Sequence, residues 1–169
     1  MLSLRPITPD DHEFLYRVYA STRAEELALT DWDDARKAGF LRMQFNAQHA
    51  YYMQHYATAS FQVIELDGWP IGRLYVDRWP AEIRIVDIAL LPEWRNQGIG
   101  TRLLENILAQ ADQAGMPVTI HVEMFNLALS LYTRLGFAPV DTHGMYYLLR
   151  SEPAGLATHV ADRSGNALG

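Results

Sequence analysis

One glycine-bearing stretch, residues 92–101, limits what this chain can fold into more than any other part of the sequence. It reads Pro92-Glu93-Trp94-Arg95-Asn96-Gln97-Gly98-Ile99-Gly100-Thr101. Gly98 and Gly100 leave no side chain between the backbone and a ligand, so the amides of residues 97–101 can face an anion. A helix that begins here adds N–H groups without acceptors and the positive end of its dipole. The stretch predicts a diphosphate-binding turn.

The flanks of this turn predict a strand, a helix and a second strand. Residues 83–91 form a near-continuous apolar run, which is typical of a central strand covered on both faces. After the turn, apolar residues recur at the spacing of one buried helical face: Gly100, Leu103, Leu104, Ile107, Leu108 and Ala111. Residues 118–124 resume strand character. This order is a βαβ unit, so the two strands should be parallel.

The remaining segments predict further helices and strands around this unit. In chain order, the first are a strand near residues 2–4, helices at 10–27 and 31–56, and a hairpin formed by residues 61–64 and 71–76. After the βαβ unit come a helix capped by Asn126 that ends near residue 135, and strands at 137–140 and 145–149. No linker splits the sequence. We expect a single domain over residues 1–150 and a C-terminal tail over residues 151–169.

Composition excludes several classes of function. Lys and Arg number 14 against 20 Asp and Glu, and the net charge of −6 argues against a general nucleic-acid binder. The absence of cysteine excludes disulfides, thiolate metal sites and a covalent Cys nucleophile. No apolar run approaches the roughly 20 residues of a membrane span, and the N-terminus lacks the pattern of a signal peptide. We expect a soluble, cytoplasmic protein with no membrane partner.

Other phosphate and metal motifs do not fit. The Gly-x4-Gly-Lys-Ser/Thr string of a P-loop is absent from the sequence. A dinucleotide fingerprint would need a third small residue where Leu103 stands. The six histidines show no HExxH pattern, so no metal is expected.

Two blocks together resemble the GNAT superfamily of acetyl-CoA-dependent N-acetyltransferases. Residues 95–100 fit the family's Arg/Gln-x-x-Gly-x-Gly/Ala signature, and residues 90–92 fit the strand exit before it. Residues 126–137 resemble the family's segment from an asparagine to Leu-Tyr-x-x-x-Gly-Phe. The resemblance covers residues 61–149. Before residue 61 only the strand, helix, helix order is similar.

The resemblance implies an α/β (α+β) fold with a mixed, mostly antiparallel central sheet of about six or seven strands. Helices would cover both faces, and the parallel fourth and fifth strands would splay apart. It also implies that acetyl-CoA is the co-substrate. The amides of Gln97, Gly98, Ile99, Gly100 and Thr101 would hold its diphosphate, with Arg95 and Asn96 at the border. The backbone of Ile88, Ala89 and Leu90 would pair with the pantetheine arm, and Asn126 would contact that arm or order the turn.

Acetyl transfer to an amine needs a neutral amine, a polarised carbonyl and a proton for the departing thiolate. A backbone N–H near Leu90 could polarise the carbonyl. The resemblance implies that Tyr132 lies near the thioester sulfur as general acid. A phenol pKa near 10 limits it mainly to hydrogen bonding to the developing thiolate. On helical spacing alone, Tyr132 would simply pack on the apolar face of its helix.

The general base is left open between several groups. Many relatives carry a Glu on the fourth strand where this chain has Arg84. Glu82 lies two residues earlier and so on the same strand face, and His121 lies on the fifth strand with a pKa suited to base work. By strand parity Asp87 and Glu123 are weaker candidates. A mechanism without a side-chain base is the remaining alternative.

The sequence supports a leading function and two rivals. We expect an N-acetyltransferase that acts by direct transfer in a ternary complex, with a small-molecule amine, a peptide N-terminus or a lysine as acceptor. A second copy of the chain, in a homodimer, is one further expected partner. The rivals are a CoA-binding sensor or partner-binding module, and a protein that binds another phosphate ligand. Aromatic residues that form either an acceptor cage or plain core are Trp32, Phe40, Phe45, Tyr51, Tyr52, Tyr56 and Trp79.

Overall fold

A computed structural model describes residues 1–154 of the chain, and the expected tail from residue 155 onward lies outside the described residues. The chain divides into two compact units. The first unit takes Met1–Tyr75 and Asp87–Gln97, and the second takes Val76–Val86 and the chain from Gly98 onward. The single domain expected over residues 1–150 stays a prediction.

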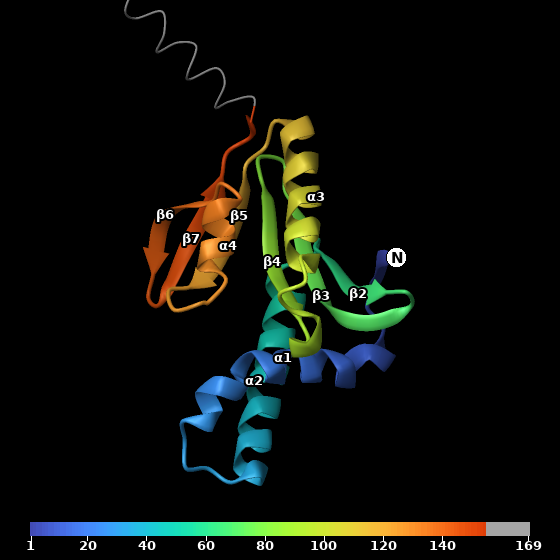
Figure 1. The fold of residues 1–169 in the computed structure, drawn as a ribbon, viewed down its shortest axis with the longest axis vertical. Coiled ribbons are helices and arrows are strands. Elements are labelled where there is room, and N and C mark those ends of the chain that lie inside the picture. The colour runs from blue at the N-terminus through green and yellow to red at the C-terminus, as the bar shows by residue number, and fades with distance from the viewer. Residues whose placement is uncertain (155–169) are drawn as a thin grey trace, which may run out of the picture. The chain divides into compact units, whose positions relative to one another are not determined.

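The elements follow the predicted order along the chain (Figure 1). They are β1 (Leu2–Pro6), the 3-10 helix η1 (Pro9–Asp11), α1 (His12–Ala28), α2 (Asp34–His55), β2 (Ser60–Leu66), β3 (Trp69–Arg78), β4 (Ile83–Leu90), the 3-10 helix η2 (Pro92–Trp94), α3 (Ile99–Ala114), β5 (Val118–Glu123), α4 (Leu129–Arg134), β6 (Ala138–His143) and β7 (Tyr146–Ser151). The seven strands form one sheet in the order β1-β2-β3-β4-β5-β7-β6. No helix within residues 1–154 is long and apolar enough to cross a membrane.

The sheet is mixed and mostly antiparallel, as expected. β1 pairs with β2, β5 with β7 and β6 with β7 in antiparallel register. β4 and β5 are parallel, with Ile83 opposite Val118 and Ile85 opposite Ile120. The predicted hairpin between β2 and β3 turns at Asp67 and Gly68, which both have positive φ (52° and 85°). Positive φ at both central residues is the geometry of a two-residue type I′ turn.

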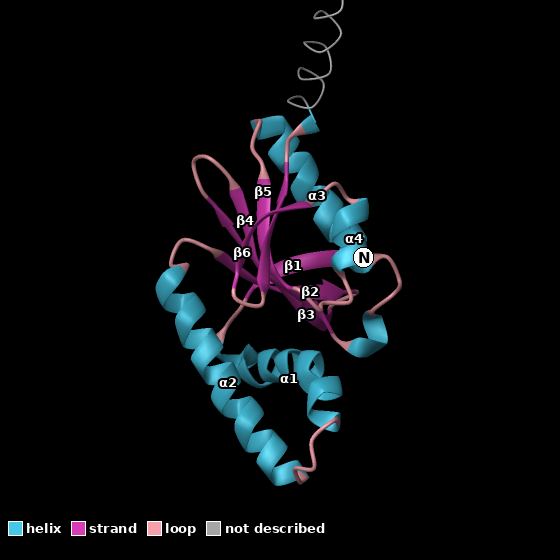
Figure 2. Cartoon of the chain, turned by 90° about the vertical axis from the view of Figure 1, so that its left-hand side faces the viewer, coloured by secondary structure: helices cyan, strands magenta, loops and turns pink. Residues whose placement is uncertain are grey.

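In the first unit, α1 and α2 run at an angle to each other (Figure 2) and pack together. Asp33 caps α2, because its carboxylate accepts a hydrogen bond of 2.8 Å from the Arg36 amide. The buried cluster consists of Leu15, Tyr19, Leu27, Leu41 and Phe45. Trp32 and Phe40 are partly buried and pack against this cluster, and their own rings meet edge to face with centroids 5.2 Å apart. Phe45 is therefore a core residue, whereas the choice between cage and core stays open for the partly buried Trp32 and Phe40.

In the second unit, α3 packs on β5 with the face that its sequence spacing predicts. Its buried residues are Leu103, Leu104, Ile107 and Ala111. The helix ends at Gly115, which adopts the left-handed conformation at φ 67°. Beyond β5, α4 and the β6 and β7 strands (orange to red in Figure 1) complete this unit.

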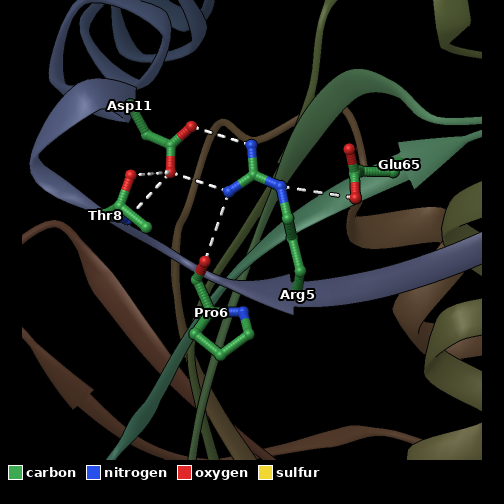
Figure 3. Close-up of polar contacts among 5 residues, drawn as sticks. All are labelled: Arg5, Pro6, Thr8, Asp11 and Glu65. Carbon is green, nitrogen blue, oxygen red and sulfur yellow. Dashed lines mark hydrogen bonds and ion pairs between the residues drawn. The ribbon is translucent and has the colours of Figure 1, made fainter.

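A buried carboxylate ties the first strand to the start of the helical region (Figure 3). Asp11 accepts two hydrogen bonds of 2.8 Å from the guanidinium of Arg5 on β1. It also accepts from the Thr8 amide at 2.8 Å, which completes a capping box at the start of η1. Glu65 on β2 contacts the other side of Arg5 at 3.3 Å. The hydrogen bonds from Arg5 hold the pKa of Asp11 at about 2, below its ordinary 3.8.

Replacing Asp11 with asparagine should lower the free energy of unfolding by about 2 kcal/mol at neutral pH. The wild-type carboxylate has a depressed pKa, so its contribution is present above the unfolded value of 3.8 and is lost as the pH falls toward about 2. Chemical denaturation of both proteins from pH 7 to pH 2 measures this. The difference between them should shrink below pH 4, and a difference independent of pH would contradict the assignment.

Candidate active site

The predicted anion-binding turn continues into an uncapped helix start in the second unit. Gly98 is the N-cap of α3 with φ 81°, no side chain caps the helix, and its first turn carries no acidic residue. The first helical hydrogen bond runs from the Arg102 amide to the Gly98 carbonyl at 3.1 Å. The amides of Ile99, Gly100 and Thr101 therefore have no acceptor within the helix. A Cβ built at Gly100 would meet no atom within 4 Å. This helix start fits an anion such as the diphosphate of acetyl-CoA.

The first-unit side of the same turn is held by Arg95. Its Nε donates to the carbonyl of Leu90 at 2.9 Å, and a terminal nitrogen donates to the Ser21 hydroxyl of α1 at 3.1 Å. Asn96 follows with φ 60°, a conformation that asparagine tolerates better than most residues. Gln97 donates from its side chain to the Glu93 carbonyl at 2.8 Å. The Arg95 side chain thus fixes the exit of β4.

The end of β4, formed by Ile88, Ala89 and Leu90, approaches β3 closely at Gly72. A Cβ added at Gly72 would lie 2.3 Å from the carbonyl oxygen of Ala89 and 3.0 Å from the Leu90 Cα. The next residue stays paired to β3, because the Leu91 amide donates to the Ile71 carbonyl at 2.9 Å. Only glycine fits at residue 72 beside this backbone. Gly72 was not among the predicted site residues, although a glycine inside a strand pattern signals such an approach.

The second unit brings Glu82 and His121, the two side-chain candidates for the general base, around Arg84. Arg84 donates from Nε to the Thr119 hydroxyl at 2.8 Å and from a terminal nitrogen to His121 Nδ1 at 3.3 Å. The Thr119 hydroxyl donates to Glu82, whose Oε2 lies 3.7 Å from Arg84. The Arg84 guanidinium also lies 4.8 Å from the Trp79 ring centroid. Arg84 therefore joins the two candidates.

The contact with Arg84 determines which hydrogen-bonding role His121 has. A guanidinium can only donate, so His121 Nδ1 must accept, and the neutral ring then carries its proton on Nε2. Burial lowers the pKa of His121, and the positive charge of Arg84 lowers it further. In this arrangement His121 is neutral and presents an N–H donor.

The two predicted site residues of the segment 126–137, Asn126 and Tyr132, lie before and in α4. Tyr132 is buried and packs edge to face on Phe137 at 5.7 Å. Asn126 accepts a hydrogen bond of 2.8 Å from the Ala128 amide, and α4 begins only at Leu129 with Ala128 as its N-cap. The prediction that Asn126 caps the helix is wrong, because Ala128 is the N-cap. The hydrogen bond from the Ala128 amide agrees with the other expected role of Asn126, which is to order the turn.

Polar residues that the sequence analysis ranked low or passed over meet in the first unit. Arg73 on β3 donates to Asp87 Oδ2 on β4 at 2.7 Å and to the Gln48 side chain of α2 at 2.9 Å. Tyr52 of α2 donates to the same Asp87 oxygen at 3.1 Å. Burial raises the pKa of Tyr52, and the charge of Asp87 raises it further, so the phenol stays protonated as a donor. The signal in the sequence was a charged residue between uncharged neighbours in each of two strands, Arg73 in one and Asp87 in the other.

Comparisons with known proteins agree with this fold. Residues 24–137 match the family model described as "Acetyltransferase (GNAT) family". An N-alpha-acetyltransferase of Sulfurisphaera tokodaii is 27% identical over 142 residues, which cover 74% of this chain and 85% of that protein. A mycothiol acetyltransferase of Nocardiopsis dassonvillei is 37% identical over 82 residues, 47% of this chain and 22% of that protein.

Solved acetyltransferase structures have a similar fold at lower sequence identity. The PaiA N-acetyltransferase from Thermoplasma acidophilum, solved in complex with coenzyme A, has a TM-score of 0.68 at 18% identity and covers 90% of this chain and 99% of its own. A GNAT family acetyltransferase from Elizabethkingia anophelis, solved with acetyl-CoA bound, has a TM-score of 0.55 at 20% identity. The match covers 89% of this chain and 97% of that protein. These two likenesses concern the fold alone.

Proposed function

The chain belongs to the acetyltransferase (GNAT) family, and from that premise we propose that it moves an acetyl group from acetyl-CoA to a primary amine. The transfer is direct and takes place in a ternary complex. The absence of cysteine supports this, since no thiol is available to carry the acyl group. Acetyl-CoA supplies an acetyl group activated as a thioester.

One observation carries the proposal: the uncapped start of α3. The amides of Ile99, Gly100 and Thr101 lack acceptors within the helix, and no carboxylate occupies the first turn. Helix starts of this kind bind phosphate groups through N–H donors and the helix dipole. We assign the diphosphate to these amides, with Asn96 and Gln97 bordering it and Arg95 acting as a positioning residue through Leu90.

The end of β4 orients the reacting group. Ile88, Ala89 and Leu90 pair their backbone with the pantetheine arm, and the Leu90 N–H polarises the thioester carbonyl. Such a donor acts without reorganisation only if its strand is fixed. The hydrogen bond from Arg95 to the Leu90 carbonyl and the close packing of Ala89 on Gly72 support this role.

Of the candidates for the base, Glu82 fits better than His121. The Arg84 contact occupies the lone pair of His121 Nδ1 and leaves a proton on Nε2, so His121 is suited to donate rather than to accept. Glu82 accepts from Thr119 through Oε2 and keeps a second carboxylate oxygen for an amine or a bound water. We therefore propose Glu82 as the proton acceptor and His121 as a hydrogen-bond donor to the acceptor molecule.

A specific observation favours one rival. Arg84 stands where many relatives carry a catalytic Glu, and a CoA-binding sensor or partner-binding module could retain the diphosphate turn without turnover. The name of the Sulfurisphaera tokodaii relative, an N-alpha-acetyltransferase, supports the proposal that this chain is an enzyme with an amine acceptor. A cytoplasmic location and a homodimer stay predictions.

The test combines an acceptor screen with one substitution. Mass spectrometry of a panel of amines and peptides should find acetylated product and free CoA. Tyr132→Phe should then lower kcat by about 10- to 100-fold with little change in KM for acetyl-CoA, because it removes a proton donor to the departing thiolate. Tyr146→Phe, an exposed tyrosine of β7, is the matched control and should keep wild-type kcat. CoA binding without any product would favour the sensor.

A further inference from the structure

The polar group around Arg84 in the second unit has hydrogen-bonding capacity that residues 1–154 do not use. Arg84 Nη2 lies 3.7 Å from Glu82 Oε2, which is too far for a hydrogen bond, and it makes none within these residues. Glu82 Oε1 and the Nε2–H of His121 also have no partner among them. Two donor groups and one acceptor are therefore available to a ligand.

The chain itself holds these groups in place. The buried hydroxyl of Thr119 accepts from Arg84 Nε at 2.8 Å and donates to Glu82 Oε2. His121 Nδ1 accepts from Arg84 Nη1 at 3.3 Å. The guanidinium carbon lies over the Trp79 ring, 4.8 Å from its centroid, which adds a cation–π contact. Side chains fixed in advance lose little conformational entropy when a ligand binds.

All three groups project from one face of the sheet. Arg84 on β4 is opposite Thr119 on the parallel strand β5. Glu82 lies two residues before Arg84 and His121 two residues after Thr119, so strand parity places their side chains together. The side chains of Arg84 and Glu82 keep 11% and 25% of their exposure, and His121 is exposed. Solvent, and hence a small ligand, reaches the group.

The ion pair between Arg84 and Glu82 differs from the structural ion pair at Arg5. There the guanidinium donates two hydrogen bonds of 2.8 Å to Asp11, the usual close geometry of such a pair. Arg84 instead donates to two uncharged side chains and stays 3.7 Å from the carboxylate. A second anion can therefore bind its free N–H groups without displacing Glu82.

These positions define the chemistry of the ligand. The free N–H groups of Arg84 and His121 require an acceptor, and a planar guanidinium suits a carboxylate because both oxygens can accept at once. The free Glu82 oxygen requires a donor, and the proposed function places the reacting amine there. An α-amino acid carries both groups on one carbon, which matches the closeness of Arg84 and Glu82. As a zwitterion it has no net charge, so the chain's net charge of −6 does not repel it.

We propose that Arg84 and His121 form the seat for a carboxylate of the acceptor, and that the acceptor is a free α-amino acid. The inference rests on the proposed function, because Glu82 then receives the proton from the amino group of the same molecule. It narrows the acceptor class, since a peptide N-terminus carries an amide where the amino acid carries its carboxylate.

Equilibrium binding to the CoA-saturated protein tests the seat without requiring turnover. Calorimetry compares glycine with glycinamide, L-leucine with L-leucinamide, and L-phenylalanine with L-phenylalaninamide. The two members of each pair differ only at the carboxyl group. For at least one pair, the wild-type chain should bind the acid at least about tenfold more tightly than the amide, a difference of about 1.4 kcal/mol.

Substitutions at Arg84 locate the preference. Arg84→Gln should remove it, and Arg84→Lys, which keeps the charge but not the planar pair of donors, should reduce it. Arg134→Gln, which removes an exposed arginine of α4, should keep it. A preference retained in Arg84→Gln, or absent from every wild-type pair, would overturn the seat. Thermal unfolding checks that each variant folds, and if Arg84→Gln does not, an undiminished preference in Arg84→Lys would overturn it equally.

Acetyl transfer to the same probes gives a second readout. The amino group of an amide has a pKa of about 7.7–8.0, as at a peptide N-terminus, and the carboxylate of the free acid raises that value. Intrinsic reactivity at neutral pH therefore favours the amide, so a higher kcat/KM for the acid would come from the seat. If the binding preference is present but no probe is acetylated, the proposed function fails and the seat stands.

Discussion

Alanine in place of Gly72 is expected to lower the free energy of unfolding by about 3 kcal/mol, the upper end of the usual cost of overpacking. For a chain of this size that corresponds to a fall in Tm of about 6–12 °C. Affinity for acetyl-CoA should fall by about tenfold or more in the same variant. Thermal unfolding and calorimetry with CoA measure the two effects.

The expected cost follows from what the new methyl group would meet. Its carbon would lie 2.3 Å from the Ala89 carbonyl oxygen and 2.9 Å from a methyl carbon of Leu90. A backbone oxygen cannot rotate away as a flexible side chain can. The end of β4 must therefore shift, and this segment is the one proposed to pair with the pantetheine arm.

Gly39→Ala is the matched control. Gly39 lies inside α2, and a Cβ there would meet no atom within 4 Å. The same substitution should therefore stabilise the chain by about 0.5–1 kcal/mol through helix propensity, and CoA affinity should stay unchanged. If Gly72→Ala were as harmless as this control, β4 would not depend on the close approach.

The parts of the fold that the sequence could predict are those with a regular period. α3 was predicted because its apolar residues recur on one face, and the β4–β5 parallel pair follows from the order strand, helix, strand. The turn at Gly98 was predicted because a positive φ there favours glycine. These features depend on local chemistry and on connection rules that hold for most chains.

The contacts of single side chains could not be predicted in this way. Strand parity ranks Asp87 low, yet Arg73 and Tyr52 hold its carboxylate from two other elements. The side chain of Arg95 was expected at the diphosphate, whereas its hydrogen bonds go to Leu90 and Ser21. Ser21 lies 74 residues away along the chain, and no local pattern contains such a pairing.

Glutamate at Thr101 should change stability and binding in opposite directions. Thr101 is the third residue of α3, where no acidic side chain is present and no side chain caps the helix. A carboxylate near the positive end of the dipole stabilises a helix by about 0.3–1 kcal/mol. The same carboxylate would repel a diphosphate held by the amides beside it.

The repulsion should dominate binding. Two like charges about 4 Å apart near a protein surface cost about 4 kcal/mol, and every 1.4 kcal/mol is about a factor of ten in affinity. Even after screening by salt, we expect Thr101→Glu to weaken CoA binding by about 100-fold or more, while Tm stays equal or rises slightly. Calorimetry with CoA and a thermal melt on the same preparation give both values.

Gln113→Glu makes the same change of charge at the other end of the same helix. Because residue 113 is exposed near the C-terminus of α3, the new charge should destabilise the helix slightly and leave CoA affinity within about twofold. If Thr101→Glu bound CoA with wild-type affinity, the assignment of the diphosphate to the start of α3 would be contradicted. A lower Tm in that variant would instead mean that the amides of the first turn already have hydrogen-bond acceptors within the chain. The CoA affinity therefore tests the ligand assignment, and the Tm tests the description of the helix start.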